Sequence, residues 1–128
     1  MKETTEDWVI KAETDYDLAD LALTGRERPI VDGVCFHSQQ CVEKYLKAYL
    51  QDNGIRFAPA HPLNPLLQLC LAVDEEFETL RTDLEGLDFY AVRVRYPGFP
   101  TGTDEVAHRA FDAATRVRAF VRGKLGLS

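Results

Sequence analysis

The stretch "FHSQQCVEKYLKAYL", residues 36–50, decides the fold class of this chain. Segment 34–52, which contains it, has neither proline nor glycine and is rich in good helix formers. Two apolar series run through the segment at helical spacing. They comprise Cys35, Val42, Leu46 and Tyr49, and also Cys41, Tyr45 and Ala48. A face this wide predicts a central helix that several neighbours cover and that ends at Gly54.

Two helices are predicted on either side of this segment. Apolar residues recur at helical steps over residues 5–23 and stop at Gly25, which predicts the first helix. The segment "RERPIVDG" then breaks the pattern, and Asp32 is expected to cap the central helix. A short third helix is expected to begin with Asn64 as its cap and Pro65 as its first residue.

The second half of the chain predicts two more helices. A helical pattern of apolar residues runs from Phe77 towards Val94, and Gly86 within it marks a bend or a boundary. The segment "YPGFPTG", residues 96–102, cannot continue a helix because it holds two prolines and two glycines. Thr103 is then placed to cap a last helix. That helix has Asp104 and Glu105 in its first turn and Arg118, Arg122 and Lys124 near its end.

No segment alternates polar and apolar residues for long enough to predict a strand. The chain is therefore expected to be all-α, an antiparallel up-and-down bundle of four to five helices joined by short connections. Its 128 residues are the length of one domain, so we expect a single bundle over residues 1–128. In such a bundle, a site is usually built from side chains on facing helices or at one end.

Composition and charge argue against several classes of protein. No apolar run approaches the roughly 20 residues of a membrane span, and the acidic start "MKETTEDW" lacks the features of a secretory signal, so a cytoplasmic location is expected. The net charge of −6 argues against a surface that grips nucleic acid throughout, and no DNA-binding motif is present. The acidic beginning and the basic end of the chain are expected either to attract each other or to face a partner.

The sequence has no pattern typical of a metal or cofactor site. His37, His61 and His108 lie in different segments, and the three cysteines lack the paired spacing of a zinc site. The segment "GFPTG" lacks the lysine of a phosphate-binding loop and follows no strand. We therefore expect neither a metal ion nor a cofactor.

Polar residues interrupt the apolar pattern of the central helix. His37, Gln40 and Lys44 are expected to share one face of that helix. Apolar residues such as Phe36 and Cys41 flank these polar side chains, so they are expected to be at least partly buried. Buried polar groups need hydrogen-bond partners. Those partners are expected within the bundle, across a dimer interface or, less commonly, in a ligand.

The segment "YAVRVRYPGFP", residues 90–100, forms a second candidate site. Arginines near a helix C-terminus commonly bond its free carbonyl groups, and Arg93 and Arg95 fit that structural role. Together with Tyr90 and Tyr96 they also form a guanidinium fork suited to phosphate, with aromatic faces suited to a base. The residues alone leave these two interpretations open.

Four segments in this order carry a resemblance to a known family. They are Trp8 with Ala12 and Asp15, then "FHSQQCVEKYLKAYL", then "HPL" with its following leucines, and then "YAVRVRYP". Together they resemble the HEPN family over essentially the whole chain. The resemblance implies a helical bundle, commonly a homodimer, with roles near nucleotides or RNA. Many small members are similar to proteins encoded beside a minimal nucleotidyltransferase in a toxin–antitoxin-like pair.

The resemblance also implies how active members work. The wider family includes metal-independent ribonucleases with an arginine followed, after four to six residues, by a histidine; the histidine moves a proton and the arginine stabilises charge on the phosphate. Here Arg93 and Arg95 are followed by "YPGFPTGTDEVA" before His108, so the corner lacks that histidine. Arg56 and His61 have the spacing, but they lie in a proline-containing loop.

Three hypotheses follow for the function. The leading one is a HEPN protein without efficient catalysis that binds a nucleotide, RNA or a nucleotidyltransferase, through Tyr90, Arg93, Arg95 and Tyr96 first and through His37, Gln40 and Lys44 second. The second hypothesis is a metal-independent endoribonuclease that uses His61 or His37 with an arginine. The third is a purely structural helical adaptor in which Arg95 pairs with an acidic residue of the first helix and no ligand binds.

Overall fold

The computed structural model describes residues 3–59, 62–93, 96–97 and 102–128. The elements are α1 (Glu3–Thr24), α2 (Val31–Asp52), α3 (Leu63–Val73), the 3-10 helix η1 (Glu75–Leu80), α4 (Arg81–Arg93) and α5 (Asp104–Lys124). The described residues contain no strand. The prediction of an all-α bundle is therefore confirmed.

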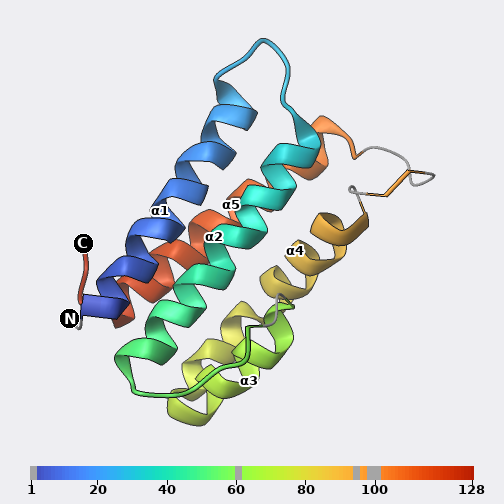
Figure 1. Ribbon diagram of the computed structural model, residues 1–128. Helices are drawn as coiled ribbons and strands as arrows, with labels where there is room; N and C mark the ends of the chain where they lie inside the picture. Colours follow the sequence, from blue (N-terminus) through green and yellow to red (C-terminus); the bar gives the residue numbers. More distant parts are fainter. Residues whose placement is uncertain (1–2, 60–61, 94–95, 98–101) are drawn as a thin grey trace.

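The long helices run up and down, with α3 and η1 packed at one end (Figure 1). The start of α1 and the end of α5 lie at the same end of the bundle, and the α1–α2 connection lies at the other end, near the start of α5 (Figure 1). Helix α2 contacts all four other α-helices. The central position that its wide apolar face predicts is confirmed.

The core is built around α2. Tyr45, Leu46 and Leu50 of this helix are fully buried, together with Phe77 from η1 and Val117 from α5. Phe77 also lies between two aromatic rings, with its ring centroid 4.5 Å from that of Tyr49 and 5.0 Å from that of Phe120. Burial of these large side chains supplies most of the driving force that holds the helices together.

All three cysteines are free thiols in this core. Cys35 and Cys41 lie on α2 and Cys70 lies on α3, and all are buried. Burial raises the pKa of the Cys35 thiol to about 11 and that of Cys70 to about 12. The pKa of Cys41 is also raised, first by burial and then by the nearby carboxylates of Glu13 and Asp15. The cysteines therefore act as small core residues.

Two predicted helix caps are wrong. Helix α2 begins at Val31 after Ile30, so Asp32 lies in its first turn rather than at its cap. Helix α3 begins at Leu63 after Pro62, so Asn64 and Pro65 lie inside the first turn. The Leu63 N–H instead donates to Asp88 Oδ2 on α4, at 2.8 Å.

The remaining boundaries are close to those expected. Thr103 caps α5 as predicted, because its Oγ1 accepts the Val106 N–H at 3.3 Å. Gly86, expected at a bend or boundary, lies inside α4 instead. The change of helix type occurs earlier, where η1 ends at Leu80 and α4 begins at Arg81. Within the described segments, no helix has both the length and the apolar character that crossing a membrane requires.

The oppositely charged ends of the chain meet inside the fold. Arg118 on α5 donates from Nε and Nη2 to the two carboxylate oxygens of Glu13 on α1, at 2.7 and 2.6 Å. Tyr45 also donates to Glu13, at 2.5 Å. These bonds hold the pKa of Glu13 below its ordinary value, with Arg118 as the largest cause. The expectation that the acidic and basic ends attract each other is confirmed for this pair.

Candidate functional site

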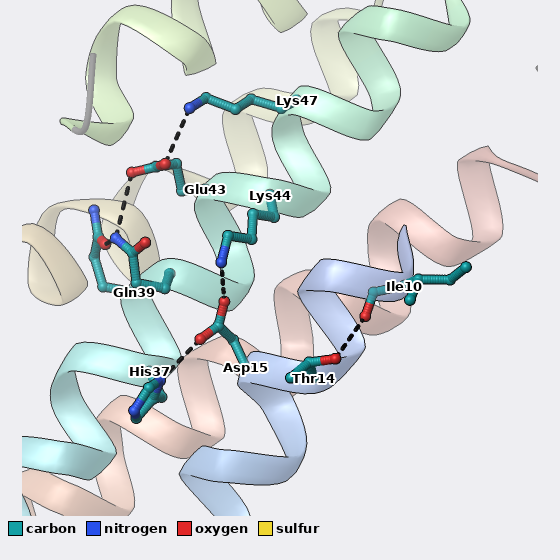
Figure 2. Close-up of polar contacts among 9 residues, drawn as sticks. Ile10, Thr14, Asp15, His37, Gln39, Glu43, Lys44 and Lys47 are labelled. Atoms are coloured by element: carbon teal, nitrogen blue, oxygen red, sulfur yellow. Dashed lines mark hydrogen bonds and ion pairs between the residues drawn. The ribbon is translucent and has the colours of Figure 1, made fainter. Parts of the chain in front are cut away.

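A buried carboxylate on α1 joins two of the candidate residues on α2. Asp15 has a side chain only 8% exposed, and its Oδ1 lies 2.8 Å from His37 Nδ1. Its other oxygen, Oδ2, binds Lys44 Nζ. Figure 2 shows both side chains reaching from α2 towards Asp15. A carboxylate removed from water needs such partners, so His37 and Lys44 first serve to satisfy Asp15.

The contact with Asp15 also determines which nitrogen of a neutral His37 ring carries the proton. Because Asp15 accepts a hydrogen bond at Nδ1, the proton of the neutral ring lies there and Nε2 carries the free lone pair. In Figure 2 the second ring nitrogen of His37 faces away from Asp15. The His37 side chain is 28% exposed, so water has access to part of the ring. The pair therefore has the geometry of an oriented acid–base group.

Gln40 does not share the environment of His37 and Lys44. Its Nε2 donates to Gln39 Oε1 at 2.8 Å and, more weakly, to Glu43 Oε1 at 3.5 Å. Within the described part of the chain it forms no hydrogen bond to Asp15. Of the three residues predicted to share one face, His37 and Lys44 therefore bind the same partner, Asp15, whereas Gln40 bonds to its neighbours on α2.

A second polar network, which Gln40 joins, links α2 to α4 and to the start of α3. Gln39 Nε2 donates to Asp88 Oδ1 at 3.2 Å, and Asp88 Oδ2 accepts the Leu63 N–H. Burial raises the pKa of the half-buried Asp88, and the negative charge of Glu43 raises it further, although the two bonds to Asp88 oppose this. This network positions the start of α3 against the bundle.

Lys47 extends this network towards α1. Its Nζ donates to Glu43 Oε2 at 3.0 Å, and both side chains are almost fully buried. The ammonium group lies 5.3 Å from the ring centroid of Trp8 and 5.8 Å from that of Phe57. Cation–π contacts of this kind offset part of the cost of burying a charge. Lys47 thereby fixes the loop after α2 against α1.

The end of α4 exposes cationic and aromatic side chains together. The Arg93 guanidinium lies 4.3 Å above the ring of Phe89, which is 52% exposed. Tyr96 is 56% exposed, and its backbone N–H bonds to the Arg93 carbonyl at 3.4 Å. Tyr90 is partly buried, and its ring packs edge-on against Phe89. Arg95, the other predicted residue of this corner, lies outside the described residues.

A groove between α4 and α5 begins at Tyr90. It has a volume of about 230 Å³, and its lining includes charged side chains of both signs, with Asp83 and Asp112 as the acidic ones. The residues that shape it include Gly86, Leu87, Tyr90, Arg109, Ala113 and Arg116. A side chain at Gly86 would meet no atom within 4 Å, so α4 leaves open space here. The groove is smaller than a typical small-molecule pocket and fits one compact group.

The remaining sequence candidates do not assemble into a site. Arg56 lies exposed in the loop after α2, and His61 lies outside the described residues. His108 is exposed in the first turns of α5. In the segments that the structure describes, no group of three His, Cys, Asp or Glu side chains could hold a metal ion.

The comparisons with known proteins agree with this architecture. The family model of the HEPN domain matches residues 5–124. The chain belongs to the HEPN family. Among solved structures, the HEPN chain is similar to TT1696 from Thermus thermophilus, with 28% identity and a TM-score of 0.77 over 96% of this chain and 99% of that chain. It is also similar to ST0689, an archaeal HEPN homologue, with 28% identity and a TM-score of 0.68 over 97% and 98% of the two chains. No curated protein matches it.

Several residues of these sites were not predicted from the sequence. Asp15 is the shared acceptor of His37 and Lys44. In the sequence, Asp15 is marked only as part of the family resemblance, without a role in a site. Asp88 and Glu43 are the acidic members of the α2–α4 network, and no local pattern marks them. Phe89 directly follows Asp88 and stacks beneath Arg93. Its i, i+4 spacing from Arg93 on a helix is a signal that could have found it.

Proposed function

We propose that this HEPN protein is a recognition component rather than an efficient enzyme. It binds a phosphate-bearing ligand, a nucleotide or a short RNA segment, at the corner formed by Phe89, Tyr90, Arg93 and Tyr96. The observation that carries the proposal is the Arg93 guanidinium stacked on the exposed Phe89 ring, 4.3 Å from its centroid. A stacked guanidinium keeps its N–H donors in one plane, where they match two phosphate oxygens.

The aromatic side chains supply the second half of the recognition. Any nucleic-acid base can stack on an exposed aromatic ring, so such stacking does not depend on the RNA sequence. Phe89 and Tyr96 are both more than half exposed. The groove that Tyr90 helps to line has room for one compact group. By its place in the chain between Arg93 and Tyr96, Arg95 belongs to the same proposed site.

Membership of the HEPN family supports a protein partner as well. In this proposal the partner is a minimal nucleotidyltransferase, and the two proteins form a toxin–antitoxin-like pair. The neighbouring genes test the pairing first, because a short nucleotidyltransferase is expected next to this gene. Co-expression with that protein is expected to give a stable complex on gel filtration. Two proteins that elute separately at micromolar concentrations would argue against it.

Calorimetric titration tests ligand binding at the corner. ATP, GTP and a short single-stranded RNA are titrated into wild type, Arg93→Ala and a control, Arg28→Ala, which removes an exposed arginine from the α1–α2 connection. Wild type and the control are expected to bind alike, and Arg93→Ala to bind at least about tenfold more weakly. Absence of binding, or equal binding by all three proteins, would remove the corner as the site.

A second candidate function is favoured by the Asp15–His37 pair. An imidazole whose Nδ1 is held by a buried carboxylate is arranged to accept a proton at Nε2, as a metal-independent endoribonuclease requires. Incubation with total RNA and EDTA tests this function in wild type, His37→Gln and His61→Ala. Cleavage that His37→Gln abolishes would support it. Cleavage that persists in both variants would indicate a contaminating nuclease.

A further inference from the structure

The groove between α4 and α5 leads away from the proposed ligand corner. The two helices run antiparallel, so the end of α4 lies beside the start of α5 (Figure 1). At the far end of the groove, Arg116 donates from Nε and Nη2 to Asp83 at 3.0 and 2.8 Å. Tyr90 and Arg109 line the near end, about 10 Å along the helices from that pair. Arg93 follows Tyr90 by about one further turn, so the corner and the groove are close enough to hold two parts of one ligand.

The charges that line the groove are balanced. Two arginines, Arg109 and Arg116, line it together with two carboxylates, Asp83 and Asp112. An anionic group such as phosphate would meet the carboxylates, and a cationic group would meet the arginines. A neutral group with both donors and acceptors is more complementary to this lining. In a nucleotide that group is the base, whereas the phosphate carries the charge.

Two of these side chains keep bonding capacity for a ligand. Asp112 is exposed and, within the described residues, forms no hydrogen bond or ion pair. Arg109 donates from Nη2 to Glu105 at 2.6 Å. A guanidinium has five N–H donors, so Arg109 keeps donors that this bond does not use. Arg109 and Asp112 are three positions apart on α5, so their charged groups lie on the same side of the helix.

The apolar residues beside these charges suit a flat ring. Leu87, Ala110 and Ala113 line the groove, and all three are buried. Gly86 also lines it, and a side chain there would meet no atom within 4 Å. Because these residues are small or lack a side chain, the helices leave a space of about 230 Å³ between them. A planar base has room there with one face against the apolar surface.

Guanine is the base whose edge matches Asp112 and Arg109. Its Watson–Crick edge presents two adjacent donors, N1–H and the N2 amino group, which pair with the two oxygens of a carboxylate. Its O6 and N7 accept hydrogen bonds from an arginine. Adenine has an unprotonated N1 in place of the N1–H, so a carboxylate there would face a lone pair. Cytosine and uracil also lack two adjacent donors on this edge.

We propose that the groove between α4 and α5 is a base pocket selective for guanine. In this pocket, Asp112 accepts from N1–H and the N2 amino group of the base, and Arg109 donates to O6. The inference rests on the proposed function, since the phosphate of the same guanosine binds Arg93 at the corner. The ligand is therefore a guanine nucleotide or a guanosine within a short RNA.

Calorimetric titration of the full chain with four triphosphates tests the choice of base. GTP is expected to bind wild type at least about tenfold more tightly than ATP, because bidentate hydrogen bonds to the correct base discriminate by that order. ITP lacks only the N2 amino group, and XTP has an oxygen in its place. Both are expected to bind more weakly than GTP, and XTP more weakly than ITP because its oxygen would face Asp112.

Asp112→Asn provides the matching reversal of specificity. Its amide keeps one acceptor for N1–H but places a donor against the N2 amino group, so GTP is expected to lose at least about tenfold in affinity. XTP, whose oxygen accepts from that donor, is expected to bind this variant more tightly than it binds wild type. Asp17→Asn removes an exposed carboxylate from α1 and is the control. It is expected to bind all four triphosphates as wild type does, and circular dichroism checks that both variants fold.

A short RNA distinguishes the two sources of guanine. A single strand with one guanosine is titrated beside the same strand with inosine at that position. Binding of the guanosine strand that is tighter than binding of GTP identifies RNA as the ligand, and the reverse order identifies the free nucleotide. In either case, inosine is expected to weaken binding as it does in ITP.

The titrations separate the base pocket from the ligand corner. A preference for GTP that Asp112→Asn retains would overturn the base pocket. Equal binding of ATP and GTP, weakened alike by Arg93→Ala, would overturn the selectivity for guanine and leave the corner in place. Absence of binding by every triphosphate and by RNA would overturn both the corner and the pocket.

Discussion

The Asp88 carboxylate on α4 caps α3: its Oδ2 accepts the N–H of Leu63 at 2.8 Å, while its Oδ1 accepts a bond from Gln39. One side chain therefore fixes the start of α3 against both α2 and α4. The capped helix follows the loop that carries Arg56, so the same contact determines where that loop ends.

Asp88→Ala is expected to lower the free energy of unfolding by about 1–3 kcal/mol. It removes the cap of Leu63 and leaves a donor of Gln39 without its acceptor. Asp88→Asn keeps one acceptor oxygen, which can still accept the Leu63 N–H, so it is expected to cost less. Urea unfolding monitored by circular dichroism measures both, and equal losses in the two variants would contradict the capping role.

The raised pKa of Asp88 gives this comparison a pH dependence. A carboxyl whose pKa is higher in the folded state favours folding most when it is protonated, and that contribution is lost as the pH rises through the folded pKa. Wild type should therefore gain stability relative to Asp88→Asn as the pH falls from 7 towards 4. An unfolding series over this range measures the difference, which should change little if the pKa of Asp88 is ordinary.

Glu13→Gln is expected to cost about 1–2 kcal/mol of stability at neutral pH, because it weakens charged hydrogen bonds to Arg118 and the contact with Arg122. The pKa of Glu13 is lowered in the fold, so this contribution is present above the ordinary value of 4.5 and is lost as the pH falls through the folded pKa. Thermal unfolding of wild type and variant from pH 7 to pH 3 should show the two curves converge. A difference that stays constant would exclude Glu13 as its source.

Asp15→Ala is expected to destabilise the protein by about 1–3 kcal/mol, since it leaves His37 and Lys44 without their shared acceptor. The partial exposure of both partners allows water to offset some of the loss. Asp17→Ala, at an exposed position two residues away, is the matched control and is expected to change stability by less than about 0.5 kcal/mol. Urea midpoints of the two variants give the comparison, and similar midpoints would show that the Asp15 contacts contribute nothing.

Gly86→Ala is expected to raise the free energy of unfolding by roughly 0.5–1 kcal/mol. Gly86 lies inside α4, where alanine has the higher helix propensity, and the added methyl group would meet nothing within 4 Å. The same methyl group narrows the groove beside Tyr90. A stability gain measured by thermal unfolding, together with weaker nucleotide binding, would place the ligand in that groove; a loss of stability would contradict the open space.

Periodicity predicts this fold well because it depends on local spacing. The central position of α2 follows from its wide apolar face, and the Thr103 cap follows from residues next to it in the chain. The start of α3 could not be predicted in the same way, since its acceptor Asp88 comes from a distant segment. The partners of Gln40 could not be predicted for a similar reason. Helical spacing gives the face on which a residue lies, but it does not show that Gln40 bonds to Gln39 and Glu43.

The candidate site could be predicted only in part. The exposure of Arg93 and Tyr96 fits the aromatic and cationic corner read from the sequence. The stacking of Arg93 on Phe89 and the groove between α4 and α5 depend on packing that a single sequence does not contain. Arg95 and His61 lie outside the described residues, and their proposed roles remain predictions.

The three buried thiols can report, without an added label, how often the helices around them open. A buried thiol is inaccessible, and burial raises its pKa so that little of the reactive thiolate forms. Such a thiol reacts with an alkylating reagent only after the surrounding helices separate. The rate at which Cys35 and Cys41 are labelled therefore measures how often α2 opens, and the rate for Cys70 measures the same for α3. Peptide mass spectrometry can follow the three positions in one sample without any engineered probe.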